Sequence, residues 1–273
     1  MIIAGGIKIP FGKSMFPDHS LLLKLDPFSN NEFEYDRGAI KVEWYYEGDA
    51  ELFTLICIKR HLDRCFSNPN VVLYMPYIPH ARMDRVKSDE DVFTLKYFCE
   101  VINSLKFDIV HVRDAHSNVS LALLENVNDL GVYSYIKRSI ALANADTLFF
   151  PDEGAMKRYS AESTLPYAFG MKNRDWKTGK ILGLDIINAD TIIDKNILIV
   201  DDICSRGGTF YHSAKALKEA GAKNVFLYVT HLEETVTVGD LPNSKLIDHI
   251  YTTKSIFPEN RLEDFKNWIT ILE

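Results

Sequence analysis

The residues best suited to do chemistry lie at 197–209, where the chain reads ILIVDDICSRGGT. Two carboxylates, Asp201 and Asp202, directly follow an apolar run, and Gly207, Gly208 and Thr209 come shortly after them. Paired glycines let backbone N–H groups turn inward around an anion, and a hydroxyl and a helix start can serve the same anion. The two aspartates are then spaced to hold sugar hydroxyls or a hydrated Mg²⁺ beside it. The segment therefore predicts a site for a phosphorylated sugar, although an ordinary strand–turn–helix would explain the same residues.

The elements around this segment alternate between strand and helix. The run at 197–200 predicts a buried parallel strand, followed by a helix over 211–220 closed by Gly221 and a strand over 225–230. Strand, crossover helix and strand indicate parallel βαβ units. Further helices are expected over 50–65, 92–105, 117–125 and 260–268, strands over 1–10, 71–74, 107–112 and 147–150, and a hairpin within 20–50.

This alternation predicts an α/β fold with two stacked domains, each with a mainly parallel sheet flanked by helices. We expect an N-terminal domain over 1–141 and a C-terminal domain over 142–273, because the pattern changes near 139–146. The last helical segment could pack back on the first domain.

The composition argues against two classes of binding partner, nucleic acids and membranes. The chain has 273 residues and a formal net charge of −7, with no basic stripe, which argues against nucleic-acid binding. No apolar run is long enough to span a membrane, and no signal peptide is evident, so no membrane partner is expected. The four cysteines lack metal-ligand spacing. Cys57, Cys65 and Cys99 are expected to be reduced core residues of a cytoplasmic protein, and Cys204, in the loop after the apolar run, is expected to be a passive loop residue, with a reactive thiol as the alternative.

Further charged groups follow other predicted strand ends, where α/β folds collect ligands. Two arginines flank an aspartate in the turn after 71–74, and arginine forks suit polyphosphate oxygens. An aspartate and a histidine follow 107–112, and another aspartate follows 147–150. Taken singly, each is explained as well by a solvated turn or a structural side chain. The residues are Arg82, Asp84, Arg85, Asp114, His116 and Asp152.

The order of these groups over 70–210 resembles that of the ribose-phosphate diphosphokinases, or PRPP synthetases, which have the type I phosphoribosyltransferase fold. Residues 76–85 are similar to the family's Pro-Tyr-x-x-Ala-Arg-Gln-Asp-Arg, 114–116 to Asp-Leu-His, and 151–154 to Pro-Asp-x-Gly. Residues 172–174 are similar to Lys-Arg-Arg, 201–209 to the phosphate loop, and 229–231 to Ala-Thr-His. The resemblance weakens before residue 50.

The resemblance implies a role for each group. It implies ATP binding by the arginine turn, a contact between His116 and the Mg²⁺–ATP site, and a metal or substrate contact for Asp152. It also implies that Lys172 and Arg174 stabilise the transferring diphosphoryl group, as positioned cations do in phosphoryl transfer. ATP is expected at Arg82, Asp84, Arg85 and Asp114, and the ribose phosphate at Asp201, Asp202, Ser205, Arg206, Gly207, Gly208 and Thr209.

Three departures from the family pattern affect the substrates. Met83 replaces a glutamine of the ATP site, and residues 35–39 lack the glutamate of an N-terminal motif that contacts adenine. Ser205 and Arg206 stand where the synthetases have Asp-Thr, which moves two formal charges toward positive. The Coulomb energy between two unit charges at contact distance is about 4 kcal/mol at an effective dielectric near 20, before the cost of desolvation is subtracted. An acceptor with more phosphate would suit this loop, and some phage relatives in NAD⁺ metabolism act on ADP-ribose.

The activity expected is an ATP-dependent pyrophosphokinase that uses Mg²⁺, acts on ribose 5-phosphate or ADP-ribose, and releases AMP. A type I phosphoribosyltransferase would share the loop at 201–209 but would leave the arginine turn and the 114–116 motif unexplained. A non-catalytic regulatory homologue would be expected to lose Lys172 and Arg174. The family resemblance further implies a homodimer or a hexamer.

Overall fold

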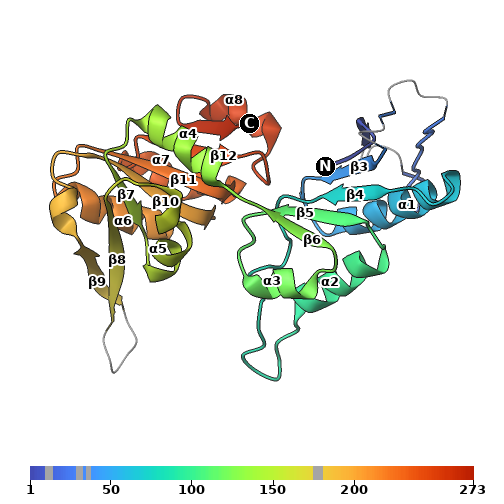
Figure 1. The fold of residues 1–273 in the computed structure, drawn as a ribbon, viewed down its shortest axis with the longest axis horizontal. Helices are drawn as coiled ribbons and strands as arrows, with labels where there is room; N and C mark the ends of the chain where they lie inside the picture. The colour runs from blue at the N-terminus through green and yellow to red at the C-terminus, as the bar shows by residue number, and fades with distance from the viewer. Residues whose placement is uncertain (10–14, 29–32, 35–37, 175–180) are drawn as a thin grey trace. The chain divides into compact units, whose positions relative to one another are not determined.

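The computed structural model describes residues 1–9, 15–28, 33–34, 38–174 and 181–273, without the side chains of 172–174 and 181–184. Within these ranges the chain divides into two compact units, Met1–Leu130 and Gly131–Glu273. Each unit has a mainly parallel sheet flanked by helices, as expected for the fold class (Figure 1).

The first unit has a sheet in the order β2-β1-β3-β4-β5-β6. Strands β3 to β6 are mutually parallel, and β1 is antiparallel to both β2 and β3. The strands are β1 Ile2–Ala4, β2 Ile7–Ile9, β3 Ile40–Trp44, β4 Val71–Tyr74, β5 Ile109–Arg113 and β6 Val127–Leu130. The helices are α1 Ala50–Cys65, α2 Thr94–Ser104 and α3 Asn118–Leu123.

The expectation of one strand over the first ten residues is wrong in detail, because the chain forms a hairpin there. Ala4 pairs with Ile7, so Gly5 and Gly6 make a two-residue turn. Their φ angles are 51° and 80°, the positive values that such a turn requires and that glycine adopts readily. The hairpin expected within 20–50 is likewise not observed among the described residues there, where the regular strand is β3.

The second unit has a sheet in the order β13-β12-β11-β10-β7-β8-β9, parallel except for the β8–β9 pair. The strands are β7 Thr147–Phe150, β8 Tyr167–Arg174, β9 Ile181–Ile187, β10 Asn196–Cys204, β11 Asn224–Leu232, β12 His249–Thr253 and β13 Ile269–Leu272. The helices are α4 Tyr133–Ala143, α5 Glu153–Tyr159, α6 Gly208–Glu219, α7 Leu241–Ser244 and α8 Glu259–Phe265. Short 3₁₀ turns lie at η1 Ser160–Glu162, η2 Ala189–Thr191 and η3 Glu234–Val238.

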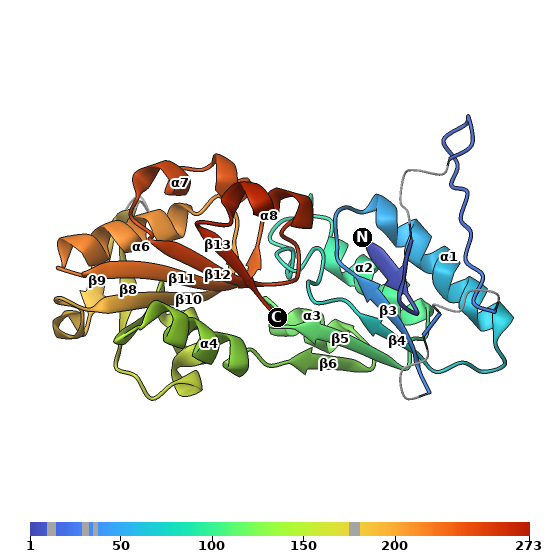
Figure 2. The same ribbon diagram turned by 90° about the horizontal axis from the view of Figure 1, so that it is seen from above.

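Strand β10 separates two cores of the second unit. Ile197 and Ile199 pack in a cluster with residues of α6, whereas Leu198 and Val200 pack in another with residues of α4 and α5. This follows from the two-residue period of a strand, whose successive side chains point to opposite faces. Figure 2 shows α6, α7 and α8 on one side of this sheet and α4 on the other. Along residues 197–200, the side chains of β10 therefore alternate between the α6 face of the sheet and the face covered by α4 and α5.

Helix α4, which the sequence pattern did not predict, belongs to the second unit. Its residues Ile136 and Ala143 are buried in the same cluster as Leu148 of β7 and Val200 of β10. The expected boundary after residue 141 falls inside this helix. At the other end of the chain, Leu262 and Phe265 of α8 pack against the α6-side core of their own unit.

Candidate functional site

The loop after β10 leads directly into α6. Gly207 is the residue before the helix and has a φ of 80°, and Gly208 is the first helical residue. The first N–H groups of a helix have no partner within it, and Gly207 has no side chain that could cap them. Gly208 and Thr209 are exposed, and no hydrogen bond within the described part of the chain takes up their N–H groups. These groups and the positive end of the helix dipole are thus available to an anion.

Gly207 cannot be replaced without strain. Its positive φ disfavours other residues, and a Cβ added there would lie 2.4 Å from Leu241 Cδ1. The backbone of Gly239 packs closely against the backbone of Arg206. A Cβ added to Gly239 would lie 2.2 Å from the Arg206 carbonyl oxygen. The side chain of Arg206 is exposed. The turn is therefore held in one conformation by residues 239–241.

Asp201 and Asp202 lie on opposite faces of β10, because they are consecutive residues of one strand. Asp202 is buried, and its Oδ2 lies 3.5 Å from the Arg158 guanidinium of α5. Asp201 is half-buried on the face that packs against α6, and its Oδ1 accepts the Asp202 N–H at 3.0 Å. Asp201 is thus on the side of the α6 start, whereas Asp202 is engaged with α5.

Ser205 contacts a residue that the sequence analysis did not identify. Its hydroxyl donates to Glu233 Oε2 at 2.7 Å and also lies 3.2 Å from Thr235 Oγ1. Glu233 follows β11, which is parallel to β10, so the ends of both strands lie at the same edge of the sheet. An acid directly after a strand that neighbours β10 was the signal that could have revealed Glu233.

Asp152 caps a helix. It precedes α5, and its Oδ1 accepts the N–H of Ala155 at 3.1 Å, which satisfies one of the free donors of the first turn. This contact accounts for an aspartate at this position without a ligand. A metal or substrate contact for Asp152 stays a prediction.

In the first unit, the two charged groups after β4 and β5 come together. These strands are adjacent and parallel, so their carboxyl ends lie at one edge. Asp84 forms an ion pair with Arg85 Nε at 2.9 Å and accepts a hydrogen bond from Ser117 Oγ at 3.0 Å. Ser117 is also the N-cap of α3 and directly follows His116. The arginine turn and the 114–116 motif thus form one cluster.

The electrostatics of this cluster follow from those contacts. Hydrogen bonds from Arg85 and Ser117, with the nearby charges of Arg85 and His116, keep the pKa of Asp84 below its usual value despite some desolvation. The Arg85 guanidinium is exposed, and Asp84 raises its pKa. Arg82 and His116 are exposed as well. The cluster therefore presents cations at the surface with one firmly ionised carboxylate among them.

Asp114 has a different environment. It is buried, and its φ of 49° lies in the left-handed region that a non-glycine residue rarely adopts. The next N–H, from Ala115, approaches Asp129 Oδ2 of β6 at 3.4 Å. Such a backbone conformation at the end of a strand turns the chain sharply toward α3.

The remaining predicted residues lie at or beyond the limits of what the structure describes. Lys172 and Arg174 belong to β8, which pairs with β9 in an antiparallel hairpin, but their side chains are outside the described set. Residues 35–37 of the altered N-terminal motif also fall outside it. The roles of both groups stay predictions.

The described residues fit a metal that is held partly by substrate phosphates. Among the described side chains, no three of the His, Cys, Asp or Glu type converge on one point. Mg²⁺ is usually held by one or two carboxylates together with substrate phosphates and water, so it does not need such a cage. Asp201 is half-buried and lies shortly before the turn that leads into α6, which suits that role. His116 and Asp152 lie in different units.

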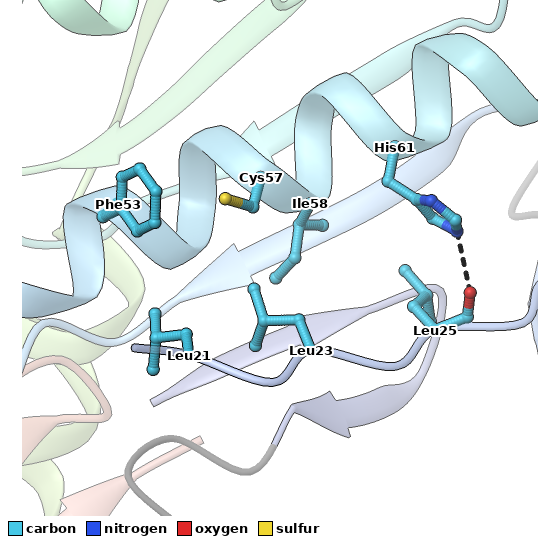
Figure 3. A pocket seen from close by; sticks show the side chains of 7 residues that line it. All are labelled: Leu21, Leu23, Leu25, Phe53, Cys57, Ile58 and His61. Carbon is cyan, nitrogen blue, oxygen red and sulfur yellow. Dashed lines mark hydrogen bonds between the residues drawn. The ribbon is translucent and has the colours of Figure 1, made fainter. Parts of the chain in front are cut away.

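A cavity of about 310 Å³ lies in the first unit between α1 and residues 21–25 (Figure 3). Its walls are mainly leucine, isoleucine and phenylalanine side chains, and no predicted site residue lines it. His61 is at one end, where its Nε2 lies 2.7 Å from the Leu25 carbonyl oxygen and must donate to it. An apolar cavity whose imidazole is already engaged does not suit a phosphate. In the described ranges no helix is long and apolar enough to cross a membrane.

Comparisons with known proteins agree with the resemblance noted in the sequence. The chain is 28% identical over 196 residues to the ribose-phosphate pyrophosphokinase of Pyrococcus abyssi, covering 68% of this chain and 66% of that one. It is 29% identical over 220 residues to that of Buchnera aphidicola subsp. Acyrthosiphon pisum, covering 74% and 65%. The chain thus spans slightly less than two thirds of the length of these relatives. No protein-family model matches it.

Among solved structures, the phosphoribosylpyrophosphate synthetase of Mycobacterium smegmatis matches with a TM-score of 0.67 at 18% identity. The match covers 87% of this chain and 83% of that structure, so it includes both units. At this identity the likeness concerns the fold. The resemblance is confirmed: the chain is similar in sequence to ribose-phosphate pyrophosphokinases and shares the fold of a phosphoribosylpyrophosphate synthetase.

Proposed function

We propose that the chain is an ATP-dependent pyrophosphokinase. It transfers the β,γ-diphosphoryl group of Mg-ATP to the anomeric hydroxyl of a ribose 5-phosphate moiety and releases AMP. The observation that carries the proposal is the start of α6, where the exposed Gly208 and Thr209 present their N–H groups just after β10, the strand that contains Asp201 and Asp202. The sequence similarity to ribose-phosphate pyrophosphokinases supports it.

The acceptor occupies the loop after β10. Its phosphate receives hydrogen bonds from the N–H groups at the start of α6 and from the Thr209 hydroxyl. The Asp201 carboxylate accepts a hydrogen bond from a ribose hydroxyl. Asp202 is paired with Arg158, and its backbone N–H donates to Asp201 Oδ1, which orients the Asp201 carboxylate. These contacts fix the ribose so that its anomeric hydroxyl is presented in a single orientation, which is the main requirement of phosphoryl transfer.

ATP occupies the cluster after β4 and β5. Arg82 and Arg85 bind phosphate oxygens, Asp84 orients Arg85 through their ion pair, and His116 lies beside them. Lys172 and Arg174 neutralise charge on the diphosphoryl group as it moves from the α-phosphate to the sugar. When bound, Mg²⁺ supplies further neutralisation of the phosphate charges.

The acceptor is either ribose 5-phosphate or ADP-ribose. Arg206 favours the second, since it adds an exposed guanidinium to the turn that binds the phosphorylated end of the ribose. A guanidinium suits the extra phosphate of a diphosphate, which ADP-ribose carries at the 5′ position. Ribose 5-phosphate consumed far more efficiently than ADP-ribose would eliminate this acceptor.

One assay separates the proposed activity from its alternatives. Purified protein is incubated with ATP, Mg²⁺ and each ribose phosphate, and AMP is measured. AMP formed only when the acceptor is present supports the pyrophosphokinase. A phosphoribosyltransferase or a non-catalytic homologue forms none. Size-exclusion chromatography with light scattering tests the accompanying proposal of a homodimer or hexamer.

A further inference from the structure

Residues 233–241 contact every residue of the turn between β10 and α6. The Glu233 N–H donates to the Cys204 carbonyl oxygen at 2.8 Å, and the Glu233 carboxylate accepts from the Ser205 hydroxyl at 2.7 Å. The backbone of Gly239 lies against the Arg206 carbonyl, and Leu241 packs on Gly207. The last residue of β10 and the three residues of the turn, 204–207, are thus held by one segment that follows the neighbouring strand.

The 233–241 segment is itself well anchored. Val236 and Leu241 are both buried in the α6-side core of the unit. Glu234, next to Glu233, points elsewhere and forms an ion pair with Arg261 of α8. A segment with two core anchors can hold the turn in a fixed position, because well-packed side chains adjust little.

The hydrogen bond between Ser205 and Glu233 commits the Ser205 proton. A hydroxyl has a single proton to donate, and a carboxylate can only accept. Thr235 Oγ1 donates to the same Oε2 at 3.3 Å, so the carboxylate gathers both hydroxyls. The Ser205 hydroxyl is therefore not a donor to a phosphate, and the carboxylate beside it repels an anion from that side. Both effects direct an anion toward the start of α6.

We propose that Glu233 is a positioning residue for the acceptor. It fixes Ser205 and the turn behind it so that the N–H groups of Gly208 and Thr209 face the acceptor phosphate. This inference rests on the proposed function for its kinetic consequence, but its structural consequence can be measured without activity. Glu233 and the turn that it holds belong to the second unit, whereas the proposed ATP cluster belongs to the first. We therefore expect Glu233 to act on the acceptor.

The main comparison is between three variants, and Ser205→Ala with the double variant is added to it. Glu233→Ala removes the acceptor of the Ser205 proton, whereas Glu233→Gln keeps a side-chain carbonyl oxygen that can accept it. Glu234→Ala is the matched control, because it removes the same charge one residue away and breaks only the exposed pair with Arg261. Thermal unfolding of each variant shows whether the second unit remains folded.

For Glu233→Ala we expect the KM for the ribose phosphate to rise about tenfold or more, as for loss of a hydrogen bond to a charged group. The KM for ATP should stay within about twofold, and Glu233→Gln should restore most of the acceptor affinity. Amide hydrogen exchange over 204–211 should accelerate in Glu233→Ala and remain at the wild-type rate in Glu233→Gln and Glu234→Ala. Ser205→Ala should give the same increase in KM, with no further increase in the double variant.

Three results would overturn the inference. One is unchanged exchange over 204–211 in a folded Glu233→Ala variant. Another is an equal rise of both KM values, which a general loss of stability would give. The third is a Glu233→Gln variant as impaired as Glu233→Ala. If the wild type forms no AMP at all, the proposed function fails, and the exchange measurement alone still decides whether Glu233 holds the turn.

Discussion

Replacing Gly207 with alanine tests the turn that carries the site. Its φ of 80° is a conformation that costs a residue with a Cβ about 1–2 kcal/mol. The new Cβ would also lie 2.4 Å from Leu241 Cδ1, and since Leu241 is buried, its displacement costs roughly another 1–3 kcal/mol. The sum is about 2–5 kcal/mol, or a fall of roughly 5–15 °C in the melting temperature for a unit of this size.

Gly208→Ala is the matched control, because a Cβ there meets no atom within 4 Å. Its φ is outside the positive range, so alanine should stabilise α6 by about 0.4–1 kcal/mol through its lower unfolded-state entropy. The added methyl group stands where the anion approaches, so the KM for the ribose phosphate should rise in this stable variant. Scanning calorimetry of the two variants gives the comparison. Equal melting temperatures for Gly207→Ala and the wild type, or an equal loss in both variants, would refute the reasoning.

Four further substitutions test the charged groups. Lys172→Ala and Arg174→Ala should each lower kcat about 100-fold or more with little change in the KM for ATP, as measured by AMP formation, because they act on the moving group. Arg206→Gln should lower kcat/KM for ADP-ribose at least about tenfold more than for ribose 5-phosphate, if the guanidinium binds the extra phosphate. Asp84 has a lowered pKa in the folded state, so its ionised form stabilises the first unit above its unfolded pKa of about 3.9, and the contribution is lost as the pH falls through the folded value. Carboxyl NMR should place its midpoint below 3.9, and Asp84→Asn should weaken the acid dependence of unfolding in that range.

Much of the fold could be predicted from periodicity. Helices α1 and α2 have apolar residues at helical spacing, and β4, β7 and the first half of β10 are short apolar runs, so a local pattern predicts each of them. Helix α4 was missed because its buried face includes Ser139 and Ala143, which do not stand out as apolar. Strand β6, with the sequence VNDL, was also missed, because it lies at the sheet edge with exposed or half-buried side chains and so has no apolar pattern.

The candidate site was proposed from residues that are close together in the sequence, and its role stays a prediction. Asp201 to Thr209 were identified because strand, acids, glycines and helix are contiguous. The clustering of Asp84 with Ser117 follows from two parallel strands that end at one edge. Glu233, Gly239 and Leu241 were not identified, since their contacts with the turn join residues about thirty positions apart and depend on how the chain returns after β11. The opposite directions of Asp201 and Asp202 were not predicted, because the strand was expected to end at Val200, whereas β10 continues through both aspartates to Cys204.

The central claim is that the start of α6 binds the phosphorylated end of a pentose. A crystal structure with ribose 5-phosphate, and a second with ADP-ribose, would test it most directly. The account predicts phosphate oxygens within about 3.2 Å of the Gly208 and Thr209 nitrogens, with a ribose hydroxyl at Asp201. A sugar phosphate bound elsewhere in the second unit, with those N–H groups facing only solvent, would contradict it.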